Sequence, residues 1–179
     1  STETLLDQDL ATIRQGGRTA ELIERLKTQV GRLDITPEEL EGRNQRSALF
    51  KTMFLAFRDA GACDWRSNLT IALSHRGSRD KLQFHHIFPK ALLRRKGYTA
   101  READDIANLA FICGKTNRQI GDREPAEYLS EFLEQGALKA FEAQCIPCER
   151  SLLASDAYTS FLRERRKLVS ARLNEFLGI

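Results

Sequence analysis

The sequence predicts a mostly helical α+β domain in which helices enclose one small β-hairpin. Apolar residues recur at helical spacing in the first and last thirds of the chain. Residues 81–122 break that rhythm with two short runs rich in branched and aromatic side chains. The chain has 179 residues, 41% of them hydrophobic, with 28 Lys+Arg against 25 Asp+Glu, which excludes a disordered tail or a membrane protein. We therefore expect a single domain over residues 1–179, with an N-terminal helical region at 1–80, a central motif at 81–122 and C-terminal helices at 123–179.

The N-terminal region is predicted to contain three helices. Two apolar stripes, interrupted at Gly16-Gly17, predict a helical pair, and their members are Leu5, Leu6, Leu10 and Ile13, then Leu22, Ile23, Leu26 and Val30. Thr36, Pro37 and Glu39 form a capping-box pattern that predicts the start of a third helix. We expect that helix to end at Gly61 and to bury Leu49, Phe50, Met53, Phe54 and Phe57.

The central segment predicts two strands followed by a helix. Residues 81–89 indicate a strand that ends near His86, because Pro89 cannot donate to a strand ladder. Residues 108–113 indicate the second strand, and 90–107 a loop that holds a short helical piece at 91–95. Gly114 closes the second strand, and residues 115–120 can turn into a helix.

The C-terminal region predicts two further helices. Pro125 can open the first, with Asp122 placed to cap it. Residues 158–177 carry an amphipathic pattern whose apolar members are Tyr158, Phe161, Leu162, Leu168, Val169, Leu173, Phe176 and Leu177. Its polar face holds Arg163, Arg165, Arg166, Lys167 and Arg172. We expect a solvated face there, with nucleic-acid contact as the alternative.

Several features bear on location and on metal chemistry. No apolar run approaches the ~20 residues that span a bilayer, and the first thirty residues do not resemble a signal peptide, so a cytoplasmic protein without membrane contact is expected. A start at Ser1 directly into helical sequence suggests a fragment of a longer protein. The four cysteines are then expected to be reduced thiols. Cys145 and Cys148 have the gap of a zinc knuckle, but no second pair follows.

Positive charge is concentrated in one segment. Residues 76–118 contain ten Lys/Arg and four Asp/Glu, a surplus of six, within a chain whose net charge is only +3. Two of the three histidines, His85 and His86, are adjacent at the end of the first predicted strand. Neighbouring side chains on a strand point to opposite faces, so both can approach one site only where the backbone turns. A structural role is the alternative for such a pair, and for His75 a loop position is expected.

An ordered set of short motifs resembles a known nuclease family. The set consists of His85-His86-Ile-Phe-Pro-Lys90, Ile106-Ala-Asn108-Leu, Lys115-Thr-Asn117-Arg118 and Pro125-Ala-Glu-Tyr-Leu129. It resembles the HNH, or His-Me finger, nucleases with their ββα-metal motif. More narrowly, it is similar to the C-terminal nuclease domain of GmrSD-like modification-dependent restriction and phage-defence proteins. The resemblance is specific over about fifty residues, from Leu82 to Leu129.

The resemblance implies a role for each of four residues. His86 would be the general base that takes a proton from the attacking water, and Asn108 would fix the loop and the orientation of that base. His85 and Asn117 would be the protein ligands of a single divalent metal ion. A neutral histidine with a pKa near ~6.5 can accept a proton at pH 7 without further tuning, which suits the first role.

The same resemblance implies a cofactor and partners. Two protein ligands leave coordination positions for water and phosphate oxygens, which favours Mg²⁺, while an imidazole ligand also admits Mn²⁺, Ni²⁺ or Zn²⁺. Asn117 stands where the family often has histidine, and His85 where it often has a carboxylate, so this site has neutral ligands only. The partners would be DNA and an N-terminal ParB-like nucleotide-hydrolysing domain that this chain does not contain.

The basic residues around the motif complete the sequence-based interpretation. Side chains expected to contact DNA phosphates without reading sequence are Lys90, Arg94, Arg95, Lys115 and Arg118, with Lys96 beside them. The sequence thus predicts a metal-dependent DNA endonuclease that serves as the cleavage module of a restriction or anti-phage defence protein. The alternatives are a catalytically inactive DNA-binding or protein-interaction module and a zinc-binding adaptor using Cys145 and Cys148.

Overall fold

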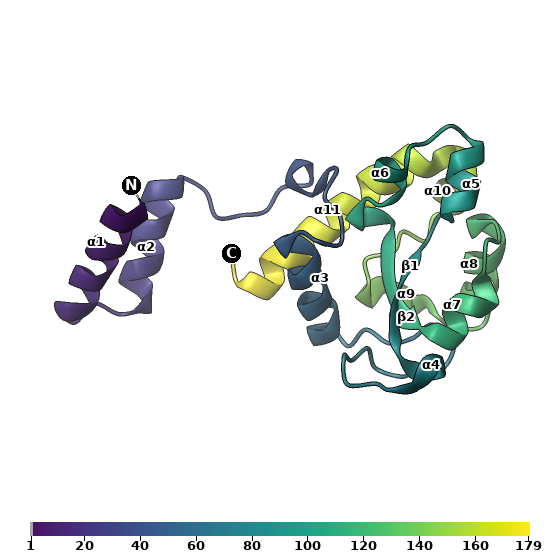
Figure 1. Ribbon diagram of the computed structural model, residues 1–179, viewed down its shortest axis with the longest axis horizontal. Helices are drawn as coiled ribbons and strands as arrows, with labels where there is room; N and C mark the ends of the chain where they lie inside the picture. The colour runs from purple at the N-terminus through teal and green to yellow at the C-terminus, as the bar shows by residue number, and fades with distance from the viewer. Residues whose placement is uncertain (1) are drawn as a thin grey trace. The chain divides into compact units, whose positions relative to one another are not determined.

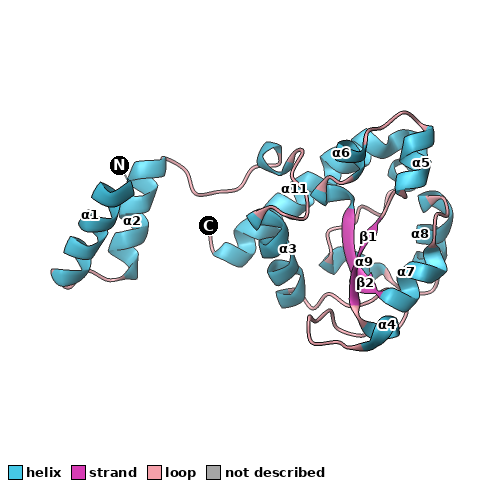
Figure 2. Cartoon of the chain, viewed as in Figure 1, coloured by secondary structure: helices cyan, strands magenta, loops and turns pink. Residues whose placement is uncertain are grey.

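The structure, a computed structural model that describes residues 2–179, groups its contacts into two compact units. One comprises Ser1–Asp34 together with Ile179, and the other comprises Ile35–Gly178. The expected division into 1–80, 81–122 and 123–179 within one domain does not follow these units, because residues 35–80 group with the central and C-terminal regions. Figure 1 and Figure 2 show the helices and strands of each unit.

The first unit is the predicted pair of helices. These are α1 (Thr2–Arg14) and α2 (Thr19–Val30), and Gly16 between them has a positive φ of 86°. The Arg25 guanidinium joins the two helices through hydrogen bonds to Gln8 and Thr12 and an ion pair with Asp9. The apolar side chains of the pair, from Leu5 to Val30, are largely exposed.

The second unit opens with a shorter helix than the sequence predicts. The capping pattern at Thr36 forms only a 3-10 turn, η1 (Glu38–Leu40), although Thr36 donates its backbone N–H to Glu39 as expected. Gly42 then takes a positive φ of 65°, and a new helix, α3 (Ala48–Asp59), begins at Ser47, whose hydroxyl accepts from the Phe50 N–H. The predicted start at residue 37 is therefore wrong, whereas the end before Gly61 is confirmed, as is the burial of the predicted stripe except for Leu49, which is only partly buried.

Two antiparallel strands form the centre of this unit. β1 (Leu82–His86) pairs with β2 (Leu109–Cys113), and His86 lies opposite Leu109. All five residues of β2 are buried, so the sheet is covered on both faces. Leu109 and Phe111 belong to one core with α3, and Ala110 and Ile112 to the other with Trp65. The predicted fold class, mostly α with a small β-hairpin, is confirmed.

The remaining elements surround the sheet (Figure 2). In chain order they are α4 (Gly77–Asp80), α5 (Lys90–Arg95), α6 (Ala100–Ala103), η2 (Ile106–Asn108), α7 (Gly114–Ile120), α8 (Pro125–Glu134), α9 (Leu138–Ala143), α10 (Arg150–Leu153), η3 (Ser155–Ala157) and α11 (Tyr158–Leu177). The helices predicted at 91–95, 115–120, from Pro125 and at 158–177 are confirmed, while the short helices α4, α6, α9 and α10 were not predicted. The N-cap of α8 is Glu124 and not Asp122, because Glu124 is the residue directly before Pro125 at the first helical position.

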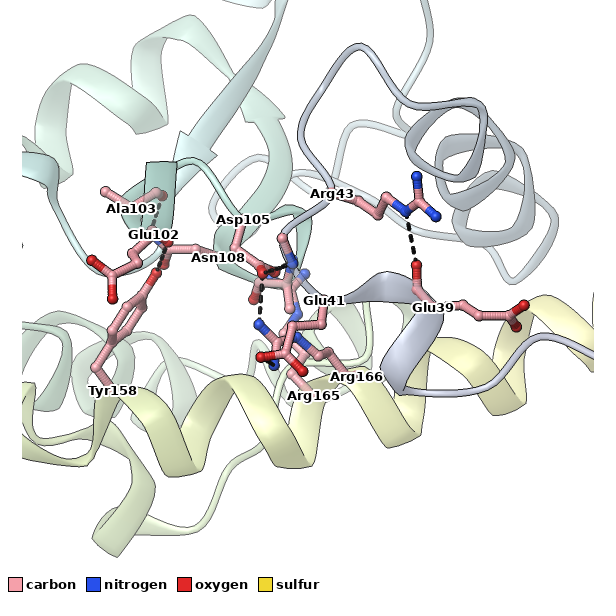
Figure 3. Close-up of polar contacts among 12 residues, drawn as sticks. Glu39, Glu41, Arg43, Glu102, Ala103, Asp105, Asn108, Tyr158, Arg165 and Arg166 are labelled. Carbon is pink, nitrogen blue, oxygen red and sulfur yellow. Dashed lines mark hydrogen bonds and ion pairs between the residues drawn. The ribbon is translucent and has the colours of Figure 1, made fainter. Parts of the chain in front are cut away.

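The helix α11 contradicts the expectation of a solvated arginine face. Arg165 is fully buried and donates to the backbone carbonyls of Ala107, Gln144 and Cys145. Arg166 pairs with Asp105, with 2.6 Å between the guanidinium nitrogen and the carboxylate oxygen. Figure 3 draws this ion pair. Because both side chains bond to the chain around η2, they hold the segment that leads into β2. Arg163 and Lys167 do lie on the exposed face.

The structure also bears on membrane-spanning helices and on the cysteines. No helix among residues 2–179 is both long enough and apolar enough to cross a membrane. The thiols of Cys63, Cys113, Cys145 and Cys148 are free, as expected. Burial raises the pKa of the Cys145 thiol, whose Sγ donates to the carbonyl of Leu168. Within the described residues of the chain, no group of three or more His, Cys, Asp or Glu side chains could hold a metal ion.

Candidate active site

The two adjacent histidines leave β1 on opposite sides. His85 points into the core, where it is 2% exposed and packs edge-on against Trp65 and Tyr128. The His86 side chain is 24% exposed and lies at the end of the strand, next to Asp104. The alternation expected for a strand therefore holds to the last residue of β1, and only His86 faces an open space.

Asn108 holds the turn that follows His86. Its side-chain oxygen accepts from the Phe88 N–H at 2.8 Å, and its amide nitrogen donates to the carbonyls of Phe88 at 3.0 Å and Ala103 at 2.9 Å. The Ile87 N–H also donates to the Asn108 carbonyl at 2.8 Å. Asn108 is fully buried, so water could not take the place of these protein partners in bonding its side-chain amide and its carbonyl. This arrangement gives Asn108 the geometry that the predicted loop-fixing role requires.

His85 has a neighbour on each ring nitrogen. Nδ1 lies 2.8 Å from Oδ1 of Asn117, which α7 presents, and Nε2 lies 3.1 Å from the hydroxyl of Tyr128 on α8. The Tyr128 hydroxyl donates to the carbonyl of Ile87 at 2.7 Å. The Asn117 amide nitrogen donates to Oε1 of Gln83 at 2.6 Å. The sequence analysis assigned no role to Tyr128. Its position within the Pro125–Leu129 motif was the one sequence signal that could have pointed to it.

The contact between His85 and Asn117 is a hydrogen bond when the ring hydrogen of His85 is on Nδ1, because the amide oxygen of Asn117 can only accept. Burial lowers the pKa of His85 to about 4, outweighing the hydrogen bond with Asn117, so the ring is neutral near pH 7 and carries one N–H. On Nδ1 that hydrogen bonds to Oδ1 of Asn117, and on Nε2 it bonds to the Tyr128 oxygen. A metal ion held by both atoms would have to replace this hydrogen and lie to one side of the line from Nδ1 to Oδ1, since the 2.8 Å between them leaves no room for an ion on that line.

The spacing of these donors also suits a divalent ion. Neighbouring ligands of an octahedral ion with bonds of ~2.1 Å lie roughly 3 Å apart, and the two atoms here are 2.8 Å apart. The types of donor and their spacing thus match the metal that the sequence predicts, provided that the ion replaces the hydrogen of this contact. An amide oxygen and an imidazole bring no negative charge, which is consistent with the expectation of neutral ligands.

Two elements position Asn117 and His85. Gly114 begins α7, and a Cβ at that residue would lie 2.5 Å from the Ser78 carbonyl oxygen, so only glycine permits the close approach to α4. The Arg118 guanidinium donates to that same carbonyl at 2.9 Å. Pro125 starts α8, which buries Tyr128 beside His85.

His86 lines a polar cleft of about 400 Å³ at the exposed edge of β1. Polar side chains that share its lining are Gln45, Lys81, Gln83, Lys90, Asp104 and Asn117. His86 Nε2 lies 2.9 Å from Oδ1 of Asp104, and Lys90 Nζ lies 2.6 Å from the same oxygen. Burial lowers the pKa of His86, the Asp104 hydrogen bond raises it, and the charge of Lys90 lowers it again. Sequence reasoning missed Asp104, since nothing in its local sequence distinguishes it from Asp105.

The predicted phosphate-contacting residues are all exposed, on two helices. Lys90, Arg94 and Arg95 belong to α5, and Lys115 and Arg118 to α7. Of these, Lys90 lines the cleft beside His86, and it also lines a neighbouring cavity of about 260 Å³ together with Arg94. The other four, Arg94 included, lie outside the lining of the cleft. Lys96 pairs with Asp156 instead.

Comparison with known proteins adds one distant relative. No protein-family model matches the chain, and no solved structure matches it. An uncharacterized protein of Methanocaldococcus jannaschii is 27% identical over 140 residues, which cover 75% of this chain and 22% of that protein. The match therefore spans about a fifth of the relative's length, and the relative's name assigns it no activity.

Proposed function

We propose that this chain is a metal-dependent DNA endonuclease of the HNH type that hydrolyses phosphodiester bonds. We further propose that it is the cleavage module of a restriction or anti-phage defence protein, as the resemblance of its motifs implies. The observation that carries the proposal is the arrangement around the end of β1. There His86 lines an open cleft, Asn108 is buried and bonded to the turn after His86, and Nδ1 of His85 lies 2.8 Å from Oδ1 of Asn117.

The chain's own residues supply most of the proposed chemistry. The free Nδ1 of His86 takes a proton from the attacking water as the new O–P bond forms and the bond to the leaving sugar oxygen breaks. That oxygen takes a proton from solvent. Asn108 keeps the backbone of the His86 turn in place during this step. Lys90, Lys115 and Arg118 hold the phosphate through charge, which positions the DNA and reads no sequence.

His85 and Asn117 would hold the metal ion. A divalent ion bound there supplies stabilisation of the negative charge on the phosphate, a contribution that no neutral side chain of the site can make. With the ion bound, the single ring hydrogen of His85 would be on Nε2, where the Tyr128 oxygen lies 3.1 Å away and can accept it.

A plasmid nicking assay tests the proposal. Purified protein is incubated with supercoiled plasmid and Mg²⁺ or Mn²⁺, with and without a chelator, and formation of open circles is followed on gels. We expect metal-dependent nicking that His86→Ala reduces by about 10²–10⁴-fold, the usual loss for a general base, without loss of folding or DNA affinity. His75→Ala is the matched control, since His75 lies in a loop outside the site.

Two results would contradict the proposal. Nicking at full rate in chelator would exclude the single-metal mechanism, and wild-type nicking by His86→Ala would remove His86 from it. DNA binding without nicking under any of the metals would favour the inactive binding module instead.

A further inference from the structure

Asp104 lies where it can control the orientation of His86. It follows α6 directly, and its Oδ1 faces Nε2 of the imidazole at 2.9 Å. The contact joins residues that are 18 positions apart, so it depends on the fold and not on local sequence. Nδ1 of His86 makes no hydrogen bond with any residue that the structure describes.

The backbone on both sides of this contact is held by one amide group. The Asn108 amide nitrogen donates to the carbonyl of Ala103, the residue before Asp104, and to the carbonyl of Phe88, two residues after His86. The Asp104 N–H donates to the Ala100 carbonyl, and the Tyr158 hydroxyl donates to the carbonyl of Glu102 (Figure 3). Asp104 and His86 are therefore kept at a set separation by buried bonds outside the pair.

A carboxylate in this position selects one form of the ring. An ionised carboxylate only accepts hydrogen bonds, so it requires the hydrogen of neutral His86 to be on Nε2. Nδ1 then carries the lone pair. Hydrogen bonds from Lys90 and His86 hold the pKa of Asp104 below its usual value despite partial burial, so the carboxylate is ionised at neutral pH.

We propose that Asp104 is a positioning residue for His86, accepting its Nε2 hydrogen and thereby presenting the Nδ1 lone pair to the attacking water. The inference rests on the proposed nuclease function. Lys90 shares the same carboxylate oxygen, with 51% of its own side chain exposed, and has the separate task of contacting phosphate. Asp104 should therefore affect the chemical step, and Lys90 the binding of DNA.

The simplest rival interpretation is that Asp104 is only a surface partner of Lys90. In that case Lys90→Met and Asp104→Asn should have similar, small effects. Under the positioning role they should differ. Asp104→Asn should lower kcat by about 10–100-fold with little change in KM, as outer residues that orient a catalytic side chain typically do. Lys90→Met should instead raise KM.

Nuclear magnetic resonance of the imidazole nitrogens tests the contact without any assay of activity. The chain has three histidines, so ¹⁵N-labelled rings give few signals, and couplings between ring protons and nitrogens identify the tautomer of each. We expect wild-type His86 to be solely the Nε2–H form. Asp104→Asn, whose amide can also donate to Nε2, should give a mixture that includes Nδ1–H, and Lys90→Met should stay as wild type.

Nicking kinetics of the same proteins complete the test. Asp104→Glu, which keeps the carboxylate, should recover some of the kcat that Asp104→Asn loses. Glu164→Gln is the matched control, because it removes a carboxylate whose ion pair with Lys167 lies on α11. Urea unfolding of each variant separates these effects from a loss of folding.

The outcomes distinguish this inference from the proposed function. If the wild-type chain nicks and Asp104→Asn nicks with the same kcat, the positioning role is wrong and the nuclease function stands. An Nδ1–H form in wild-type His86 would also overturn the role. If the wild-type chain does not nick DNA with any of the metals tested, the nuclease function is wrong. The catalytic role of Asp104 is then wrong as well, even if His86 has the expected tautomer.

Discussion

Asn117 shows how much the role of one side chain depends on its neighbours. Its amide nitrogen is bonded to Gln83, which leaves its oxygen facing Nδ1 of His85. An asparagine alone binds a divalent ion weakly, and the paired imidazole supplies the second donor. The contact of Tyr128 orients His85, and the contact of Gln83 orients Asn117.

Replacement of Asn117 should therefore weaken metal binding more than it weakens the fold. We expect Asn117→Ala to raise the metal concentration for half-maximal nicking by about tenfold or more, the usual effect of losing a ligand-shell residue. The measurement is a titration of Mg²⁺ or Mn²⁺ in the nicking assay. Gln119→Ala, an exposed position on the same helix, is the control. An unchanged midpoint in Asn117→Ala would exclude Asn117 as a ligand.

At the scale of elements, α11 is attached to the sheet by a buried cation. Arg165 lies four residues from both Phe161 and Val169, which places it on the buried side of the helix. Its guanidinium donates to three carbonyls from two separate loops. A buried charge is tolerated only when its donors are bonded in this way. Arg165 therefore connects α11 to the segment that carries Asn108.

Loss of the Arg165 guanidinium should destabilise the fold strongly. Arg165→Met keeps much of the side-chain volume but leaves the three carbonyls without donors. We expect the free energy of unfolding to fall by on the order of 3 kcal/mol, measured by urea denaturation. Arg163→Met, on the exposed face of the same helix, should change it by less than about 0.5 kcal/mol. Similar effects of the two variants would contradict the structural role of Arg165.

A second connection between elements is the buried carboxylate of Asp64. Its oxygens accept from the N–H of Cys113 at the end of β2, from the hydroxyl of Thr116 on α7, and from Ser67 within its own loop. Burial alone would raise the pKa of Asp64, but the hydrogen bonds from Ser67, Cys113 and Thr116 outweigh it and hold the pKa below 3.8. Asp64 thus fastens the β2–α7 junction beside Asn117.

This lowered pKa predicts acid sensitivity of the fold. Between the unfolded and folded pKa values the unfolded chain binds more protons, so stability falls as pH decreases. The contribution of Asp64 is complete above about pH 5 and is lost as pH falls below 3.8 through the folded value. We expect urea midpoints of wild type and Asp64→Asn to converge over this range. Asp122→Asn, which replaces an exposed carboxyl, is the control and should show no such convergence of its urea midpoint with that of wild type. A difference between the midpoints of Asp64→Asn and wild type that stays constant with pH would contradict the proposed link to Asp64.

At the scale of the whole molecule, charge is distributed unevenly along the chain. Residues 76–118 carry a surplus of six positive charges, and their exposed members on α5 and α7 belong to the same compact unit as the cleft. Ion pairs of Lys90 with Asp104 and Lys96 with Asp156 compete with phosphate for two of these charges. Binding of DNA should therefore be electrostatic, weak at physiological salt and indifferent to sequence.

The salt dependence of DNA affinity measures this surface. If four to six charges neutralise phosphates, the logarithm of affinity should fall with the logarithm of salt at a slope of roughly −4 to −5. Replacing Lys115 and Arg118 together by Ala should reduce the slope by about two and slow nicking. Fluorescence anisotropy with a short duplex gives the slopes. Arg163→Ala is the control, and a slope altered by Arg163→Ala but not by the double variant would place the DNA surface elsewhere.

Local patterns in the sequence were sufficient for most of the secondary structure. The helical pair, both strands, α7, α8 and α11 follow from apolar spacing and from glycine and proline positions, because those signals act between residues a few positions apart. The helix expected from Thr36 failed for the same reason. Its capping box formed locally, but the left-handed turn at Gly42 prevented continuation and Ser47 started α3 afresh.

The fold class was thus determined by the sequence itself, while the polar partners of the motif residues were decided only by the tertiary structure. Asp104 on His86, Tyr128 on His85, and Asp64 on Thr116 join residues that are 18, 43 and 52 positions apart. Hydrophobic periodicity states which face of an element is buried, but not which buried group will satisfy a particular donor or acceptor. That pairing depends on how the helices pack around the sheet, since a buried polar group is stable only where packing delivers its partner.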